Sequence, residues 1–142
     1  MGVLVLVMGT LKRRQRNHAH MEGARYIREA YTQAANFTLR EFDSKSWPGR
    51  VTPSVIEGKG KHRIAGELYE VNDEMLRRLD KFEQRGRYYK RITVKLMDGK
   101  LAQMYVHMPH SGKKPRARPR FISYSNRERA SWSETFPQAI PS

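Results

Sequence analysis

The sequence predicts an α+β domain with several strands and one main helix. Three observations predict this class: a continuous apolar run near the N-terminus, a second apolar run at Arg63–Val71, and one segment with helical spacing of its apolar residues. The chain has 142 residues, of which 38% are apolar, so it is long enough for one domain that buries a single core.

The first predicted strand is the run Val3–Met8, which is largely β-branched and ends at Gly9. A run without polar interruptions is typical of a strand buried on both faces, so we expect it to be central in its sheet. The run is too short for a signal peptide or a membrane span. We therefore expect a cytoplasmic protein that does not enter a membrane.

The segment that follows the basic loop has an ambiguous pattern. Residues 23–42 fit either one helical face or two strands with a turn near Ala35-Asn36, and the abundance of Thr, Tyr and Phe favours the strands. Residues 43–60 contain Trp47-Pro48-Gly49, Pro53 and further glycines. We expect this second stretch to be irregular.

The main helix is predicted after the strand Arg63–Val71, over residues 73–84, with Asn72 or Asp73 as its N-cap and Gly86 beyond its end. Its apolar positions share one face: Met75, Leu76, Leu79 and Phe82.

A hairpin is predicted after the helix. Residues 88–97 and 101–107 have strand composition, and Asp98-Gly99 between them suits a tight turn.

The composition changes at His110. The stretch 110–121 combines cations with prolines and has no acidic residue, which predicts an extended and mobile segment. We therefore divide the chain into a domain at 1–109 and a basic, proline-containing C-terminal extension at 110–142 that is partly flexible. Residues 122–142 contain a few aromatic side chains, and two alternatives stay open: packing back onto the domain as a short element, or disorder.

The net charge of +14 favours acidic partners, with nucleic acid or an acidic protein foremost, although a basic surface can also serve solubility alone. Two segments carry the cations that form the candidate anion-binding surface: Lys12, Arg13, Arg14 and Arg16 in the first, and Lys113, Lys114, Arg116, Arg118 and Arg120 in the second.

Metal and thiol chemistry have little support in the sequence. There is no cysteine, which excludes disulfides, a thiol nucleophile and cysteine-based zinc sites. His18 and His20 form one pair of histidines, and His107 and His110 form another, but no third ligand with suitable spacing accompanies either pair. We expect loop histidines in solvent, no metal and no cofactor.

One carboxylate has an unusual position. Glu83 follows Leu79 by four residues and Leu76 by seven, so it shares their helical face. A carboxyl group at the edge of a buried face is costly to ionise, and the resulting rise in pKa makes a glutamate a usable proton acceptor near neutral pH. The alternative is that Glu83 turns to water or pairs with Arg85 or Arg87.

Four motifs occur in register: "VLVMGTLKRRQRNH", "WPG", "AGELYEV" and "LRRLDKFEQRGRYYKR". Together they resemble the gamma-glutamylcyclotransferase-like family, and most closely its gamma-glutamylamine cyclotransferase and AIG2-like branch. The resemblance extends over about Val3–His107. It implies a small mixed α/β barrel with one main helix.

The resemblance also implies an enzyme that converts a gamma-glutamyl amine or a related conjugate to 5-oxoproline and a free amine. The substrate's own α-amine attacks its γ-carbonyl, so the enzyme supplies a proton acceptor and no nucleophile. The matching motif assigns this general acid/base role to Glu83.

The turn at Gly9-Thr10-Leu11 matches the family's substrate-binding turn, whose main-chain groups hold the substrate. Met8 stands where the family has a tyrosine. Arg14 stands where the family usually has a glycine, which predicts a narrower pocket or a more anionic substrate.

Two aromatic residues complete the candidate substrate site: Trp47 and Tyr89. Each can line a pocket or stack on bases, although the strand context of Tyr88 and Tyr89 favours core packing.

Two functions therefore stay open. The first is a gamma-glutamylcyclotransferase-like enzyme, supported by the Glu83 motif. The second is a catalytically weakened member of the same family that uses its basic surface to bind nucleic acid or an acidic protein, supported by Met8 and by the charge.

Overall fold

The computed structural model describes residues 2–44, 47–58, 60–83, 88–109, 114–126 and 128–134. Its elements in chain order are β1 (Val3–Val7), the 3-10 helix η1 (His18–Met21), β2 (Arg25–Tyr31), β3 (Phe37–Asp43), β4 (Val51–Glu57), β5 (Arg63–Val71), α1 (Asp73–Phe82), β6 (Tyr89–Lys95), β7 (Leu101–His107), β8 (Ile122–Ser125) and β9 (Arg129–Trp132). The predicted α+β class with one main helix is confirmed.

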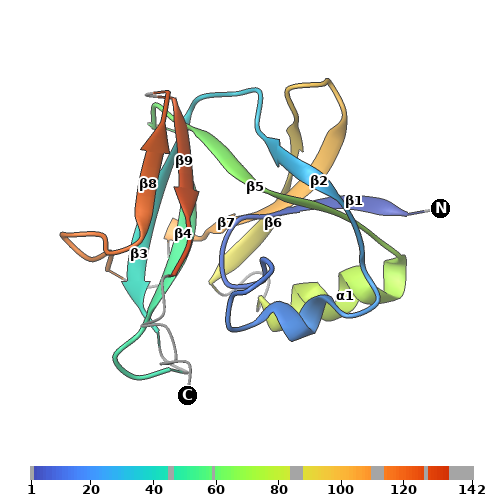
Figure 1. Ribbon diagram of the computed structural model, residues 1–142, viewed down its shortest axis with the longest axis horizontal. Coiled ribbons are helices and arrows are strands. Elements are labelled where there is room, and N and C mark those ends of the chain that lie inside the picture. Colours follow the sequence, from blue (N-terminus) through green and yellow to red (C-terminus); the bar gives the residue numbers. More distant parts are fainter. Residues whose placement is uncertain are drawn as a thin grey trace, which may run out of the picture.

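The larger sheet has the strand order β6-β7-β1-β5-β9-β8, and β2 also pairs with β5. Strands β3 and β4 form a separate two-stranded sheet. Figure 1 shows α1 below the crossing of β1 and β5, and the β3–β4 and β8–β9 hairpins together at the other end of the molecule. Among the described strands the larger sheet stays open, so the expected closure into a barrel is not found.

Strand β1 is central, as predicted. It pairs antiparallel with β5 on one side and parallel with β7 on the other. Val5 and Val7 pack towards α1 in one core cluster, whereas Leu6 and Met8 belong to the second cluster, which lies on the opposite face. The uninterrupted apolar run therefore corresponds to a strand buried on both faces.

The two-strand alternative for residues 23–42 is confirmed by β2 and β3. The expected irregular stretch at residues 43–60 is wrong for β4, which pairs with β3 along its whole length. Pro53 lies within β4, opposite Glu41. A strand with a partner on one side only tolerates a proline because the missing N–H is not needed on its free side.

Helix α1 begins as predicted, because the side chain of Asn72 accepts a hydrogen bond from the N–H of Met75 at 2.8 Å. Its buried residues are Met75, Leu76 and Leu79. The helix ends at Phe82, and Gln84 and Gly86 lie outside the described residues. The predicted hairpin of β6 and β7 is confirmed, with Arg91 opposite Tyr105.

Over Ile122–Trp132 the C-terminal stretch packs back onto the domain as a hairpin, which was the first of the two alternatives. Strand β9 pairs parallel with β5, and Trp132 is completely buried in the core. The indole N–H of Trp132 donates to the carboxyl group of Glu41 in β3 at 3.0 Å. The hairpin therefore packs on the same core as the preceding strands. Phe136, another of the aromatic residues in the stretch 122–142, lies outside the described residues.

None of the helices in the described parts of the chain is long and apolar enough to cross a membrane.

Candidate active site

A pocket lies where β1 ends, between that strand, β4, the end of α1 and the β6–β7 hairpin. It has about 50 Å³ of free space. Its lining comes from segments far apart in the sequence: Leu6, Val7, Met8, Gly9, Thr10, Leu11, Thr52, Pro53, Ser54, Val55, Glu83, Tyr89 and Tyr105. The structure therefore brings the expected carboxylate and the expected glycine turn to one pocket.

Glu83 reaches this pocket because it is the C-cap residue of α1. Its backbone N–H donates to the carbonyl of Leu79 at 2.9 Å, which continues the helical hydrogen bonding by one residue. Leu79 is buried against β1, so the end of the helix is fixed over the sheet. The Glu83 side chain is partly exposed and lines the pocket. The expected rise in its pKa stays a prediction.

Tyr89 also lines the pocket, as expected. Its hydroxyl lies 3.1 Å from the hydroxyl of Ser54 on β4, and one of the two donates to the other. The pKa of Tyr89 is raised to about 12, mainly by burial and also by the nearby charge of Glu83, while the bond to Ser54 partly opposes the rise. The phenol therefore stays protonated beside the carboxylate at neutral pH.

A second phenol, Tyr105 on β7, lines the same pocket. It donates a hydrogen bond to Asp80 Oδ1 at 2.7 Å. Burial is the main cause that raises the pKa of Tyr105, followed by the bond to Asp80; the charge of Glu83 adds to the effect. Both phenols thus lie within electrostatic reach of Glu83.

The turn after β1 is held in shape by its own loop. Asn17 donates from its side chain to Thr10 Oγ1 at 3.0 Å and from its backbone N–H to the Thr10 carbonyl at 3.0 Å. His18 Nδ1 lies 2.9 Å from the carbonyl of Leu11. Three successive hydrogen bonds therefore fix the turn before any ligand is present.

Gly9 is required in this turn for packing. A Cβ at Gly9 would lie 2.6 Å from Cγ of Pro53, which is closer than real Cβ atoms approach. The glycine lets β4 come close to the end of β1, and this contact helps to form the pocket wall. Met8 is buried in the core, 8% exposed, and lines the pocket without a hydroxyl.

Two expected site residues lie elsewhere. Trp47 is 45% exposed in the connection between β3 and β4 and does not line the pocket, because that connection extends away from β1. Arg14 is exposed and is not among the lining residues either, so the expected narrowing of the pocket is not found. Its φ of 68° lies in the left-handed region that favours glycine, which accounts for the glycine usual at this position.

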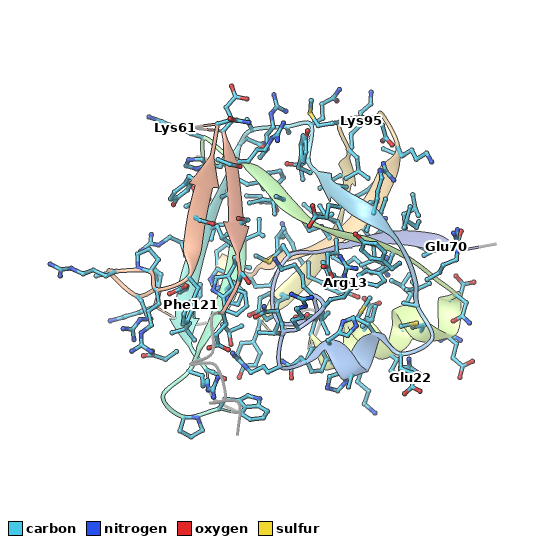
Figure 2. All side chains as sticks on the ribbon, in the orientation of Figure 1. Arg13, Glu22, Lys61, Glu70, Lys95 and Phe121 are labelled. Atoms are coloured by element: carbon cyan, nitrogen blue, oxygen red, sulfur yellow. The ribbon has the colours of Figure 1, made fainter. Side chains whose placement is uncertain are left out.

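The basic loop after β1 does not present all of its cations to solvent. Arg13 donates from its backbone N–H and from Nε to the two oxygens of Glu67, at 2.8 and 3.1 Å, and its guanidinium lies over the ring of Tyr26. Figure 2 shows Arg13 near the middle of the view, below the crossing of β1 and β5. Arg16 forms an ion pair with Glu134 in which both side chains are buried.

Lys12, the first cation of this loop, faces a separate cavity. This cavity, of about 320 Å³, is also lined by Glu29, Glu67 and Arg129. Burial lowers the pKa of Lys12, although the charges of Glu67 and Glu29 raise it in part.

The cations of the second segment are likewise divided. Arg116 pairs with Asp43 at 2.8 Å, and Arg120 donates from its guanidinium to the carbonyl of Gly49 at 3.3 Å. Lys114 and Arg118 are exposed, and Lys113 lies outside the described residues. The two segments therefore supply structural contacts as well as surface charge.

The histidines have ring neighbours. His20 packs on Phe82 with 4.1 Å between ring centroids, and His107 stacks on Phe42 at 4.8 Å. His110 lies outside the described residues. Within the described ranges, His, Asp and Glu side chains form no group of three that can hold a metal ion.

Sequence reasoning missed Ser54, Thr52 and Tyr105 as pocket residues. Ser54 and Thr52 were hidden because Pro53 made β4 look irregular. Tyr105 carried no clear signal, because strand alternation places it on the face of β7 that also carries Gln103 and the exposed Leu101.

The fold and the pocket define a class: a small α+β protein in which a glycine turn after a central strand meets a glutamate at the end of the single main helix. The family model for gamma-glutamyl cyclotransferase, AIG2-like, matches residues 5–132. The chain belongs to this family, which confirms the resemblance seen in the motifs.

Two mammalian proteins are similar to this chain in sequence. The chain is 34% identical over 96 residues to gamma-glutamylaminecyclotransferase from Mus musculus, covering 65% of this chain and 62% of the relative. It is 36% identical over 91 residues to the protein of the same name from Bos taurus, covering 63% of this chain and 54% of that relative. The matched region thus spans less than two thirds of these relatives.

Among solved structures, a crystal structure of an AIG2-like protein from Mus musculus superposes with a TM-score of 0.59 and 27% identity. The match covers 78% of each chain.

Proposed function

We propose that this chain is a gamma-glutamyl cyclotransferase that converts a gamma-glutamyl amine or a related conjugate to 5-oxoproline and a free amine. The observation that carries the proposal is the meeting of Glu83 with the Met8–Leu11 turn in one pocket. Family membership and the curated gamma-glutamylaminecyclotransferase relatives support the same reaction class.

In the proposed reaction the α-amine nitrogen of the substrate bonds to the γ-carbonyl carbon. The bond from that carbon to the leaving nitrogen then breaks, and the carbonyl is restored. Glu83 takes one proton from the attacking amine and delivers it to the leaving nitrogen, so the reaction needs no water and no redox partner. Backbone N–H groups of the Gly9-Thr10-Leu11 turn would hold the charge that develops on the carbonyl oxygen.

The alternative of a basic binding protein has lost part of its support. Arg13 and Arg16, two of the expected anion-binding cations, bind Glu67 and Glu134 instead. The Arg16 charge is therefore buried, whereas Arg13 remains half-exposed but is paired with Glu67. Lys114 and Arg118 still present positive charge to acidic partners.

The experiment is release of 5-oxoproline by the purified protein from a panel of gamma-glutamyl amines, amino acids and peptides. We expect turnover with at least one substrate, and a loss of about 100-fold or more in Glu83→Gln because the proton acceptor is removed. Glu74→Gln is the matched control, since it makes the same change at an exposed position in the first turn of the same helix. A folded wild-type protein that is silent on the whole panel would overturn the proposal.

A further inference from the structure

The end of α1 is joined to the β6–β7 hairpin by one carboxyl group. Asp80 Oδ1 accepts from the hydroxyl of Tyr105 at 2.7 Å and from Arg91 Nε at 2.8 Å, and Oδ2 accepts from Arg91 Nη2 at 3.2 Å. Arg91 also donates to Gln103 Oε1 at 2.7 Å. Because Arg91 and Tyr105 are opposite each other in the hairpin, they reach Asp80 together.

This arrangement determines which hydrogen-bonding role Tyr105 can have in the pocket. A phenol has one proton, and Tyr105 donates that proton to Asp80. The paired guanidinium makes Asp80 a strong, charge-assisted acceptor, which keeps the proton in this direction. The Tyr105 oxygen therefore has only lone pairs to offer. A ligand can form a hydrogen bond with it only by donating a proton to it.

The other hydroxyl groups of the pocket have different hydrogen-bond partners. The hydroxyls of Tyr89 and Ser54 bond to each other, and the hydroxyl oxygens of Thr10 and Thr52 accept from Asn17 and Arg16. Glu83 is an acceptor, and in the proposed reaction it takes a proton from the attacking amine. Glu83 and Tyr105 are thus two acceptors of different kinds in the same pocket.

The attacking α-amine has two N–H bonds, of which Glu83 can take only one. We propose that Tyr105 is a substrate-positioning residue that accepts a hydrogen bond from the second N–H, so that the nitrogen lone pair is directed at the γ-carbonyl. The inference rests on the proposed function and names the group that Tyr105 recognises. After ring closure one N–H remains on the lactam nitrogen of 5-oxoproline, and Tyr105 keeps its hydrogen bond to it.

The test compares two ligands that differ at this one atom. One is 5-oxoproline, and the other is its lactone analogue, 5-oxotetrahydrofuran-2-carboxylate, in which an oxygen replaces the ring N–H. Binding of both is measured by calorimetry to the wild-type protein, to Tyr105→Phe and to Tyr89→Phe. Tyr89→Phe is the matched control because it removes a phenol from the same pocket.

We expect the wild-type protein to bind the lactam about threefold to tenfold more tightly than the lactone, which is the effect of one net hydrogen bond. Tyr105→Phe should lose most of this preference. Tyr89→Phe should keep it, even where its affinity for both ligands falls. A KM that changes little while kcat falls in Tyr105→Phe would be the corresponding kinetic result.

Equal affinity of the wild-type protein for the two ligands overturns the inference, and this result does not depend on whether any variant folds. A folded Tyr105→Phe that keeps the full preference overturns it as well. If 5-oxoproline is released and bound but the preference is absent, only the role of Tyr105 fails. If the wild-type protein neither binds 5-oxoproline nor turns over any substrate, the proposed function fails and Tyr105 loses its role with it.

Discussion

Arg16, in the loop after β1, forms an ion pair with Glu134, at the end of the described chain, with 3.0 Å between Nη1 and Oε1. Both side chains are almost completely buried, at 5% and 4% exposed. The other terminal nitrogen of Arg16 donates to the carbonyl of Val51 and to Thr52 Oγ1, at 2.8 and 3.1 Å. The loop that carries the substrate turn is thus attached both to β4 and to the residues that follow β9.

Removing one member of this pair should destabilise the protein strongly. We expect Glu134→Gln to lower the free energy of unfolding by about 3 kcal/mol, because it leaves the Arg16 charge buried without its carboxylate. The measurement is urea unfolding followed by circular dichroism. The matched control is Glu70→Gln, which breaks the exposed pair with Arg25 and should cost less than about 1 kcal/mol. Equal costs for the two variants would contradict the structural role of Arg16.

Arg14→Gly should stabilise the protein. The φ of 68° at Arg14 is unfavourable for a residue with a Cβ, and glycine removes that strain at some cost in unfolded-state entropy. We expect a net gain of about 0.5–1 kcal/mol in the free energy of unfolding. Arg14→Ala is the control: it removes the charge but keeps the Cβ, so a gain of the same size in this variant would assign the effect to charge.

Trp132→Phe, a change in the C-terminal hairpin, should lower the stability of the protein. The indole N–H is one of the donors to the buried carboxyl group of Glu41, and the backbone N–H groups of Arg120 and Phe121 are the others. Loss of the indole donor and of packing should lower the free energy of unfolding by about 2–3 kcal/mol. Trp47→Phe, at an exposed tryptophan, should stay within about 0.5 kcal/mol of the wild-type protein.

The stability of the protein should fall at high pH, in part through Tyr89. Its pKa is about 12 in the folded protein against an ordinary value of 10.0, so the folded state favours the protonated phenol. This contribution is complete below pH 10 and is lost as the pH rises through 12. The difference in unfolding free energy between the wild-type protein and Tyr89→Phe should therefore decrease from about pH 9 to pH 12. A constant difference over this range would contradict the raised pKa.

The sequence predicted the parts of the site that depend on local pattern. The apolar run of β1 ends at Gly9, and helical spacing places Glu83 on the same face as Leu76 and Leu79. The resemblance to the family, and not these two patterns alone, implied that both belong to one site. The Asp98-Gly99 signal located the hairpin of β6 and β7 but not its register: Lys95 lies opposite Leu101, which makes the loop one residue longer than a two-residue turn. Such features depend on residues within one or two turns of each other, where composition is informative.

The sequence did not predict the partners of the charged side chains. Arg16 and Glu134 are 118 positions apart, and nothing in either segment shows that the two charges meet in the interior. A run of cations has the same composition whether its members face solvent or neutralise buried carboxylates. Strand β4 was missed because its proline suggested a loop. The free edge of a two-stranded sheet accommodates this proline, and the sequence does not show which strands have a free edge.

The donors to Glu41 have a consequence for the order of folding. They lie 79, 80 and 91 positions after Glu41 in the chain. Until those residues dock, the carboxyl group of Glu41 on β3 lacks these three hydrogen bonds, although it lies in the future protein interior. Contacts that close so long a stretch of chain form slowly, because the entropy of the intervening residues is lost first. We therefore expect the β3–β4 hairpin to reach its final packing only when β9 has joined β5, as a late step in the acquisition of the native state.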